Sequence, residues 1–333
     1  MSTDNKVTSP VHILFLGCRG CGKTSLLASM YQELDGKGVE KFSAEQETVH
    51  ALQRALVRMK EGLEHAKTGD EVTEGLRGGE KADVYQFAAQ TVCTGKRMWP
   101  LDDLSVRITC PYIFTDLPGG WYAGEGEHDA EVSQHLCRSA VSFLTIDAPA
   151  LAEGGSIHEE RNQPMVIRNW YKGNLHELAG KHTVIIILSR CERFINAPQL
   201  REKLQSRLKE EYGSLATHLR NNGIPVYATY VKTLGGLSFN RYREGRDNVR
   251  EAVFTKTGDY RPENCAAPLM MALEYGLNAI QKHVQEEAED VWDGLAGWLG
   301  LSTDILVAEG VTAIRDSFRE ARVMATEDSL LEV

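Results

Sequence analysis

The sequence predicts an α/β fold of three layers, in which helices cover both faces of a mostly parallel central sheet. Five short apolar segments rich in β-branched and aromatic residues are continuous rather than alternating, as expected of strands buried on both faces. Segments with helical periodicity separate them, which is typical of strand–helix–strand units. These segments predict strands at residues 11–16, 108–115, 140–146, 182–188 and 224–231, and helices at 24–34, 44–67, 128–138, 157–171, 198–212 and 262–285. A further strand is expected near 84–92, within the insertion that precedes 108–115.

Length and composition fit a globular protein of one large domain or two modest ones. The chain has 333 residues, 42% hydrophobic and 25% charged, which excludes disordered and fibrous classes. Its longest apolar run, 184–188, is far shorter than the ~20 residues that a membrane-spanning helix needs, and no secretory signal is expected. Seven cysteines, an odd number, indicate a reduced protein, so we expect a cytoplasmic location.

Negative charge is concentrated toward the C-terminus. Residues 286–333 contain 12 acidic and 3 basic residues, whereas the formal net charge of the whole chain is −10. The preceding residues are therefore close to neutral, which argues against a nucleic-acid-binding protein, because such proteins need a strongly basic surface. The acidic tail is expected to be helical and appended to the main core rather than part of it.

A phosphate-binding loop follows the first predicted strand. Residues 17–24 read G-C-R-G-C-G-K-T and satisfy the pattern G-x-x-x-x-G-K-[ST], with a strand before and a helix after. The glycines let backbone N–H groups turn toward a phosphate, Lys23 is expected to reach the β- and γ-phosphates, and Thr24 to hold Mg²⁺. The helix N-terminus adds N–H donors. The nucleotide-binding residues predicted here are Gly17, Cys18, Arg19, Gly20, Cys21, Gly22, Lys23, Thr24 and Ser25.

Two cysteines, Cys18 and Cys21, lie within this loop at the spacing of a redox or metal pair. A zinc site needs a second pair of ligands, and none stands at suitable spacing. We therefore expect both to fill loop positions as small residues. The alternative is that oxidation of the pair closes the loop against nucleotide.

A second motif, T-D-L-P-G-G at residues 115–120, ends the strand predicted at 108–115. Asp116 is expected to hold Mg²⁺ through water, as acids on a neighbouring strand do in P-loop nucleoside triphosphatases. Gly119 lets a backbone N–H approach a γ-phosphate, a contact that hydrolysis removes. Alone, Asp116 could equally cap a turn, but the phosphate loop favours the metal site.

The order of these motifs resembles the translation-factor-related (TRAFAC) class of P-loop GTPases, of which Ras-like small GTPases are the compact example. The resemblance covers residues 11–234 and implies GTP or GDP as ligand, with Mg²⁺ as cofactor. Within that class, the long first insertion, the D-L-P-G form and the helical C-terminal extension are similar to bacterial GTPase-like proteins predicted to serve multi-gene conflict systems. On this basis residues 8–285 are predicted to form a P-loop G domain with an insertion at about 36–105. Residues 286–333 are predicted to form an acidic helical extension.

In GTPases the strand corresponding to 182–188 is followed by [NT]-K-x-D, which reads the base. Here the segment is Ser189-Arg190-Cys191-Glu192. Ser189 can hydrogen-bond the phosphate loop, Arg190 can lie along the base, and Glu192 can accept from guanine. The alternatives are a solvated ion pair of Glu192 with Arg190 or Arg193, and relaxed base choice that includes ATP. Backbone N–H groups of Val231 and Lys232 are expected to approach the guanine O6.

Hydrolysis is expected to be slow. GTPases of this class often place Gln directly after the D-x-x-G loop to orient water, but this chain has Gly120, and Glu125, Glu127 and His128 would have to fold back. Arg19, near the expected γ-phosphate, either stabilises transition-state charge or points away. Thr73 is the candidate for completing the Mg²⁺ shell, with Thr68, Thr91 and Thr94 as alternatives. The catalytic candidates are therefore Lys23 and Arg19.

The leading prediction is a GTP-binding switch with slow hydrolysis, which signals to a protein effector or regulator through nucleotide-dependent loops. A nucleotide-binding scaffold without turnover and an ATP-using P-loop enzyme are the alternatives. A phosphotransferase would need an arginine-rich lid, for which the arginines at 241–246 and Arg250 are the candidates. A homo-oligomer is compatible with the sequence. The amphipathic run at 291–301 is expected to pack onto the domain rather than onto a partner, and its acidic polar face argues against a membrane surface.

Overall fold

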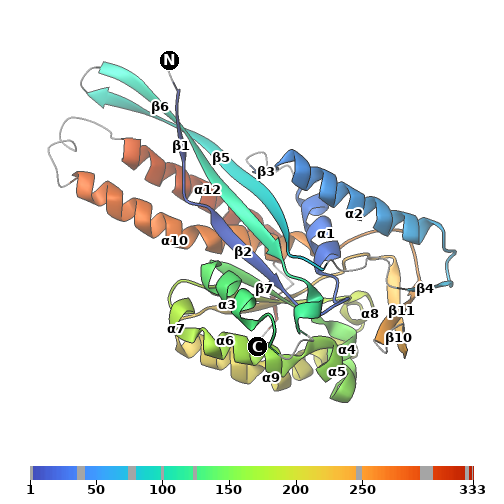
Figure 1. The fold of residues 1–333 in the computed structure, drawn as a ribbon. Helices are drawn as coiled ribbons and strands as arrows, with labels where there is room; N and C mark the ends of the chain where they lie inside the picture. Colours follow the sequence, from blue (N-terminus) through green and yellow to red (C-terminus); the bar gives the residue numbers. More distant parts are fainter. Residues whose placement is uncertain are drawn as a thin grey trace.

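The computed structural model describes residues 3–35, 42–73, 80–98, 101–122, 126–244, 250–292, 303–326, 330–331 and 333. These residues form a mixed α/β structure in which helices cover both faces of a central sheet (Figure 1). The predicted fold class is confirmed. No helix among these residues combines the length and apolar character that crossing a bilayer requires.

The central sheet has the order β12-β9-β8-β7-β2-β6-β5-β3, and β1 pairs with β6 beyond the start of β2. Pairing is parallel along β6-β2-β7-β8-β9 and antiparallel where β5, β3 and β12 join. The strands are β1 Thr3–Val7, β2 Val11–Leu16, β3 Phe42–Ala44, β5 Asp83–Met98, β6 Leu101–Asp116, β7 Val141–Asp147, β8 Thr183–Ser189, β9 Val226–Tyr230 and β12 Leu330–Leu331.

All five predicted strands are present, because their continuous apolar runs are buried on both faces; every residue of β7 and β8 is buried. Two strands are longer than predicted. β5 and β6 pair residue by residue from Asp83–Asp116 to Met98–Leu101, forming a hairpin that projects from the main body (Figure 1). Its outer half carries exposed residues, such as Val92 and Arg107, and this mixed polarity hides its strands from a search for apolar runs.

Side chains of the central strands alternate between two hydrophobic cores. In β2, Ile13 and Phe15 belong to the core under α1, α2, α10 and α12, whereas Leu14 and Leu16 belong to the core under α3, α6 and α9. This alternation produces the three layers. The helices are α1 Lys23–Asp35, α2 Gln46–Glu64, η1 Gly119–Tyr122, α3 Asp129–Arg138, α4 Ala148–Glu153, α5 Gly155–Asn162, α6 Pro164–Gly173, α7 Leu175–Leu178, α8 Glu192–Ile195, α9 Pro198–Asn221, α10 Ala266–Trp292 and α12 Thr303–Thr326.

The single helix predicted at 157–171 is two helices, α5 and α6. Gln163 adopts a left-handed conformation with φ 42°, and Pro164 begins α6. Proline lacks the N–H that a continuous helix needs and disfavours helical geometry at the residue before it. α9 is longer than predicted, reaching Asn221 instead of 212.

A second sheet, which the sequence did not predict, joins two distant parts of the chain. It consists of β4 Glu71–Thr73, from the insertion, and the hairpin of β10 Leu237–Glu244 and β11 Arg250–Lys256. We call it the small sheet. It lies beside α2 (Figure 1) and has its own hydrophobic core, formed by Leu63, Leu237, Phe239, Ala252 and Phe254.

The C-terminal helix α12 contributes to the main core, contrary to the expected appended tail. Leu306, Ile314 and Phe318 are fully buried there. Gly310 allows close approach to the sheet, since a Cβ at this position would lie 2.3 Å from Ile108 Cδ1. The predicted domain boundary at 285 falls inside α10, which continues to Trp292. Most of the run at 291–301 lies outside the described residues, so its packing stays a prediction.

Candidate functional site

The loop between β2 and α1 is built around three glycines with positive φ. Gly17, Gly20 and Gly22 have φ values of 152°, 76° and 93°. A Cβ on Gly17 would lie 2.7 Å from the carbonyl oxygen of Thr145 on β7, so only glycine fits between the loop and the sheet. The loop therefore closes on the carboxyl edge of the parallel strands, where α/β proteins bind their ligands.

Lys23 and Thr24 open α1 and are both already engaged. The ammonium group of Lys23 donates to the carbonyl oxygen of Gly17 at 2.7 Å, and the Thr24 hydroxyl donates to Asp116 Oδ2 at 2.7 Å. The Thr24–Asp116 contact spans 92 residues of sequence and brings the two predicted metal ligands together.

The surroundings of Asp116 suit a cation bound beside Thr24. The Oδ1 atom of Asp116 is buried and has no hydrogen-bond partner among the described residues. Burial raises the pKa of Asp116, and the opposing effects of Lys23 and Thr24 do not overcome it. Mg²⁺ prefers oxygen ligands. The unpaired carboxylate oxygen of Asp116, beside the Thr24 hydroxyl, therefore suits Mg²⁺ itself or a water molecule bound to it.

Gly119 packs directly onto the phosphate loop. A Cβ at Gly119 would lie 2.3 Å from the backbone nitrogen of Arg19, whereas a Cβ at Gly120 would meet nothing within 4 Å. The D-x-x-G segment and the phosphate loop are thus in backbone contact at Gly119. This proximity agrees with the prediction for that glycine.

One cavity of about 440 Å³ connects the predicted motifs. Ten of the predicted site residues line it: Arg19, Gly20, Gly22, Lys23, Thr24, Ser25, Thr73, Gly119, Arg190 and Glu192. Seven do not: Gly17, Cys18, Cys21, Asp116, Ser189, Val231 and Lys232. Thr73, the metal candidate from the insertion, is positioned by β4, where it pairs with Val253 of β11.

The sequence did not single out several cavity residues. α2 contributes Arg54 and Arg58, β5 contributes Asp83 and Tyr85, and the small sheet contributes Phe254. The arginines stand four residues apart, on one face of a helix. Without knowing that α2 packs beside the phosphate loop, this spacing could not be distinguished from a solvent-exposed face.

Ser189 and Arg190 bind the phosphate loop from β8. The Ser189 hydroxyl lies 2.7 Å from the carbonyl oxygen of Cys21, as the sequence predicts. Arg190 has a left-handed backbone, with φ 61°. Its guanidinium donates to the carbonyl oxygen of Gly20 and to Asp147 Oδ2, the latter at 2.7 Å. The head of Arg190 is therefore committed to these contacts, rather than extended along a base as predicted.

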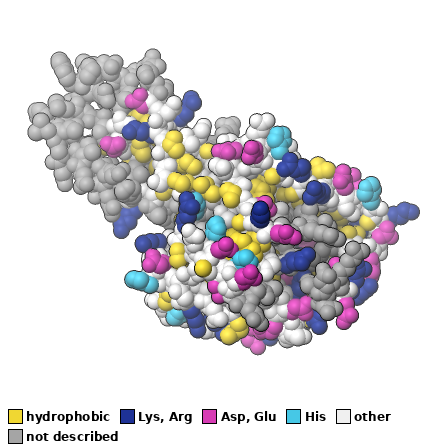
Figure 2. Space-filling view, viewed as in Figure 1, with side chains coloured by type: hydrophobic (Ala, Val, Ile, Leu, Met, Phe, Trp, Pro, Cys, Tyr) yellow, Lys and Arg dark blue, Asp and Glu magenta, His cyan; other side chains and the backbone are white. Residues whose placement is uncertain are grey.

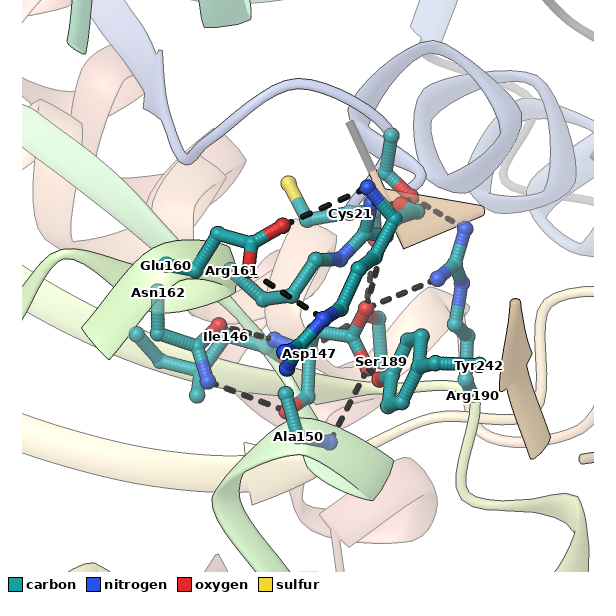
Figure 3. A network of polar contacts seen from close by, with 12 residues as sticks. Cys21, Ile146, Asp147, Ala150, Glu160, Arg161, Asn162, Ser189, Arg190 and Tyr242 are labelled. Atoms are coloured by element: carbon teal, nitrogen blue, oxygen red, sulfur yellow. Dashed lines mark hydrogen bonds and ion pairs between the residues drawn. The ribbon is translucent and has the colours of Figure 1, made fainter. Parts of the chain in front are cut away.

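Asp147, at the end of β7, is the centre of a buried polar network (Figure 3). Arg161 donates to the same Oδ2 at 3.0 Å and to Gly20 O at 3.3 Å, and the Tyr242 hydroxyl donates to Oδ1 at 2.8 Å. Burial alone would raise the pKa of Asp147, but Arg190, Arg161 and Tyr242 outweigh it and lower the pKa. Two guanidinium groups therefore converge on Gly20, and Asp147 positions both.

Glu192 lies on the cavity wall and is partly buried. Its Oε1 accepts from the backbone N–H groups of Leu234 and Gly235, at 3.2 and 3.3 Å. Burial raises its pKa, although those hydrogen bonds act in the opposite direction. Among the described residues, no ion pair of Glu192 with Arg190 or Arg193 is present; the carboxylate instead fastens the loop after β9.

Val231 and Lys232 do not reach the cavity. The N–H of Val231 donates to Leu188 O and that of Lys232 to Glu263 O, at 2.9 and 3.0 Å, so both donors are used by the fold. The residues of this loop that line the cavity are Thr233 and Leu234. The two predicted N–H groups are not available because sheet pairing continues one residue beyond β9 and Lys232 forms a bridge with Glu263.

The paired cysteines behave as packing residues. Cys18 and Cys21 are free thiols, 5% and 1% exposed, and burial raises the pKa of both. A buried thiol with a raised pKa forms little thiolate and reacts slowly. Within the described part of the chain, no group of three or more His, Cys, Asp or Glu side chains could hold a metal ion, which gives no support to a zinc site.

Three of the arginines considered for a phosphotransferase lid, Arg241, Arg243 and Arg250, are engaged elsewhere, and Arg246 lies outside the described residues. Arg241 pairs with Glu71, Arg243 with Glu251 and Arg250 with Glu160. The first two pairs lie within the small sheet, the third joins it to α5, and none of the three arginines lines the cavity. Across the described surface seen in Figure 2, acidic and basic side chains are interspersed.

The water-orienting position is occupied by glycine. Beyond Gly120, the Trp121 ring stacks on His128, with centroids 4.5 Å apart, and His128 Nδ1 contacts Glu131 at 2.7 Å. Neither His128 nor Glu127 lines the cavity, and Glu125 lies outside the described residues. Arg19 is exposed and lines the cavity.

No known family model and no curated protein matches this chain. It is similar to the solved structure of the Saccharomyces cerevisiae Ski7 GTPase-like domain bound to GTP, at 18% identity and a TM-score of 0.35; the match covers 68% of this chain and 43% of that one. The small COPII coat GTPase SAR1 of Encephalitozoon cuniculi in complex with GDP is 14% identical with a TM-score of 0.31, and the match covers 68% of this chain and 70% of that one. The LeoA bacterial dynamin GTPase is 12% identical with a TM-score of 0.28, and the match covers 66% of this chain and 30% of that one. This chain thus spans less than half of the Ski7 chain.

Proposed function

We propose that this chain is a GTP-binding switch that slowly hydrolyses GTP to GDP and phosphate. The observation that carries the proposal is the single cavity lined by Lys23 and Thr24 of the phosphate loop, Gly119 of the D-x-x-G segment, and Arg190 and Glu192 of the base loop. These groups come from three separate places in the sequence. Their convergence on one cavity is what a nucleoside triphosphate requires and what a merely structural turn does not.

Each part of the ligand has a matching group. Backbone N–H groups of the phosphate loop and the N-terminus of α1 suit the phosphates, and Lys23 is close enough to exchange the Gly17 carbonyl for a phosphate oxygen. Thr24, Asp116 and Thr73 would hold Mg²⁺. When bound, Mg²⁺ neutralises charge on the β- and γ-phosphates. Glu192 would accept from the N1–H and amino group of guanine.

Turnover is proposed to be slow because the residue after Gly119 has no side chain to orient water. In the reaction, water attacks the γ-phosphorus and the bond to the β–γ bridging oxygen breaks. Arg19, exposed on the cavity wall, is the proposed source of positive charge for that step. The same missing side chain favours the second candidate, a scaffold that holds nucleotide without hydrolysis.

The switch is proposed to act on a protein partner in the cytoplasm. Asp116 and Gly119 contact the phosphate loop directly, and Thr73 belongs to the small sheet. A γ-phosphate that orders these residues would change the surface around them, as order–disorder switches do. A nucleotide kinase gains no support, because the candidate lid arginines that the structure describes, Arg241, Arg243 and Arg250, pair with acidic residues away from the cavity.

The test is calorimetric binding of GTP, GDP and ATP with Mg²⁺ to the wild type and to Lys23→Ala. We expect GTP and GDP to bind, ATP to bind more weakly, and Lys23→Ala to lose at least about tenfold in affinity, equivalent to ~1.4 kcal/mol. Single-turnover phosphate release, with Arg19→Ala for comparison, then separates a slow enzyme from a scaffold. Absence of binding at millimolar Mg²⁺–nucleotide would overturn the proposal.

A further inference from the structure

The small sheet forms part of the cavity wall. Val72 and Thr73 of β4, Leu237 of β10 and Phe254 of β11 all line it, together with Leu234 before β10. α2 contributes Ala55 and Met59 to the lining, and the phosphate loop contributes residues between Arg19 and Ser25. The sequence motifs identify residues only at the phosphate loop, the D-x-x-G segment and the base loop, residues 189–192.

The small sheet is fixed to the rest of the site on two sides. Tyr242 of β10 donates to Asp147, and Arg161 donates to the carbonyl oxygen of Arg250 at 2.9 Å. On the other side, Lys256 Nζ donates to the carbonyl oxygens of Leu63 and Ala66, at 2.7 and 2.9 Å. The wall that it contributes is therefore held by the same network that positions the base loop.

Phe254 is the aromatic residue that the small sheet presents to this cavity. Its side chain is 5% exposed and lies in the hydrophobic core of the sheet, yet it also lines the cavity. The guanidinium carbon of Arg190 lies 5.2 Å from its ring centroid. Since Arg190 is held by Asp147 and Gly20, the Phe254–Arg190 pair forms a fixed surface.

A purine base needs two kinds of contact on leaving water. Polar groups satisfy its edge, and flat apolar or cationic groups cover its faces. Glu192 suits the edge, but the sequence motifs supply no aromatic group for a face. Phe254 supplies an apolar face-covering group in the same cavity as Glu192, and Arg190, whose head is committed to Gly20 and Asp147, holds that wall in place.

We propose that Phe254 is a base-binding residue, against which the purine of the bound nucleotide packs, so that the small sheet forms the base-side wall of the site. The inference rests on the proposed nucleotide-binding function and adds a residue that no motif identifies. It makes the β10–β11 hairpin part of ligand recognition. The phosphates, in contrast, remain with the loop at 17–24.

The test compares a ligand that has a base with a ligand that has none. GDP contains the base, whereas inorganic tripolyphosphate offers phosphates alone, and both are titrated with Mg²⁺ into the folded full chain. We expect Phe254→Ala to weaken GDP binding roughly tenfold, as loss of a base–aromatic contact does, and to leave tripolyphosphate binding within about twofold. Phe254→Leu, which keeps apolar volume and is less disruptive to the core, should show the same selective loss to a smaller extent.

Phe239→Ala is the matched control. Phe239 has the same exposure, 5%, and shares the small-sheet core with a ring 6.1 Å from that of Phe254, but it does not line the cavity. It should leave the ratio of GDP to tripolyphosphate affinity unchanged. If Phe254→Leu, checked to be folded, keeps the wild-type ratio, this inference is wrong while the proposed function stands. If the wild type binds neither ligand, both fail.

Discussion

At the scale of single residues, the structure gathers those predicted phosphate-site residues whose identity the chemistry dictates, while their binding of phosphate stays a prediction. Lys23, Thr24 and Gly119 have few substitutes, and the structure brings all three to one cavity. Asp147 was missed, although an acid at the end of a buried strand and before Pro149 is a detectable signal. Its role depends on two arginines that lie 14 and 43 residues away, and no local pattern reveals that pairing. Val231 was misplaced because its N–H completes a sheet hydrogen bond.

The adjacent glycines of the D-x-x-G segment give a residue-scale prediction. Gly119→Ala places a methyl group 2.3 Å from the Arg19 nitrogen and must push the two loops apart, whereas Gly120→Ala meets nothing within 4 Å. A lost hydrogen bond to a charged phosphate costs ~1.5–3 kcal/mol. We expect Gly119→Ala to weaken binding of a non-hydrolysable GTP analogue roughly tenfold or more, with a smaller effect on GDP. Calorimetry on both variants measures this.

Gly120→Ala serves as the internal comparison for that measurement and should bind both ligands as the wild type does. Equal losses for GTP analogue and GDP in Gly119→Ala would mean that the glycine supports the loop without sensing the γ-phosphate.

At the scale of elements, apolar continuity predicted the buried strands and helical periodicity predicted most helices. It could not predict the small sheet, because β10 and β11 carry charged residues on their outer side and β4 has only three residues. Sequence reasoning also predicted that the segment forming α12 is appended to the core rather than part of it. The acidic charge of the tail dominates its composition, whereas its position depends on Leu306, Ile314 and Phe318 on one helix face.

Two helical glycines give an element-scale prediction with opposite signs. Gly213→Ala in α9 meets open space and should stabilise the protein by up to ~1 kcal/mol, since alanine favours helices. Gly310→Ala in α12 has the same helical gain but meets buried Ile108, and overpacking costs ~1–3 kcal/mol. Urea denaturation should therefore show a higher midpoint for Gly213→Ala and a lower one for Gly310→Ala.

Stabilisation by both alanines would show that α12 can move away from the sheet, and hence that its packing is looser than the contact with Ile108 indicates.

At the scale of the whole molecule, buried ionisable groups make stability depend on pH. His182 lies directly before β8. Its Nε2 shares a hydrogen bond with the Ser142 hydroxyl at 2.8 Å, and its Nδ1 lies 2.7 Å from the carbonyl oxygen of Ser139. Burial lowers the pKa of His182 to about 4. In the unfolded chain a histidine has a pKa of about 6.5. Below that pH the unfolded state binds more protons than the folded state, so acidification lowers the free energy of unfolding.

The folded protein should therefore lose stability as pH falls from 7 to 5, and His182 alone should account for about 2 kcal/mol of this. Asp147 acts in a lower window, because its lowered pKa gives stability that is lost only below about pH 4. We expect His182→Gln to flatten the dependence between pH 7 and 5 in urea unfolding. His50→Gln, at an exposed position on α2, should leave the dependence as in the wild type.

An unchanged slope in His182→Gln would assign the pH dependence to other groups.

The paired strands β5 and β6 begin and end at the cavity, where Asp83 faces Asp116, and run 16 residues away from it. At ~3.3 Å per residue, each strand extends about 50 Å. A tilt of one degree at the ligand end thus displaces the far end by about 0.9 Å, from the same strand length. The base of the hairpin lies at the cavity, so a small rigid tilt there is geometrically amplified at the opposite end of the molecule.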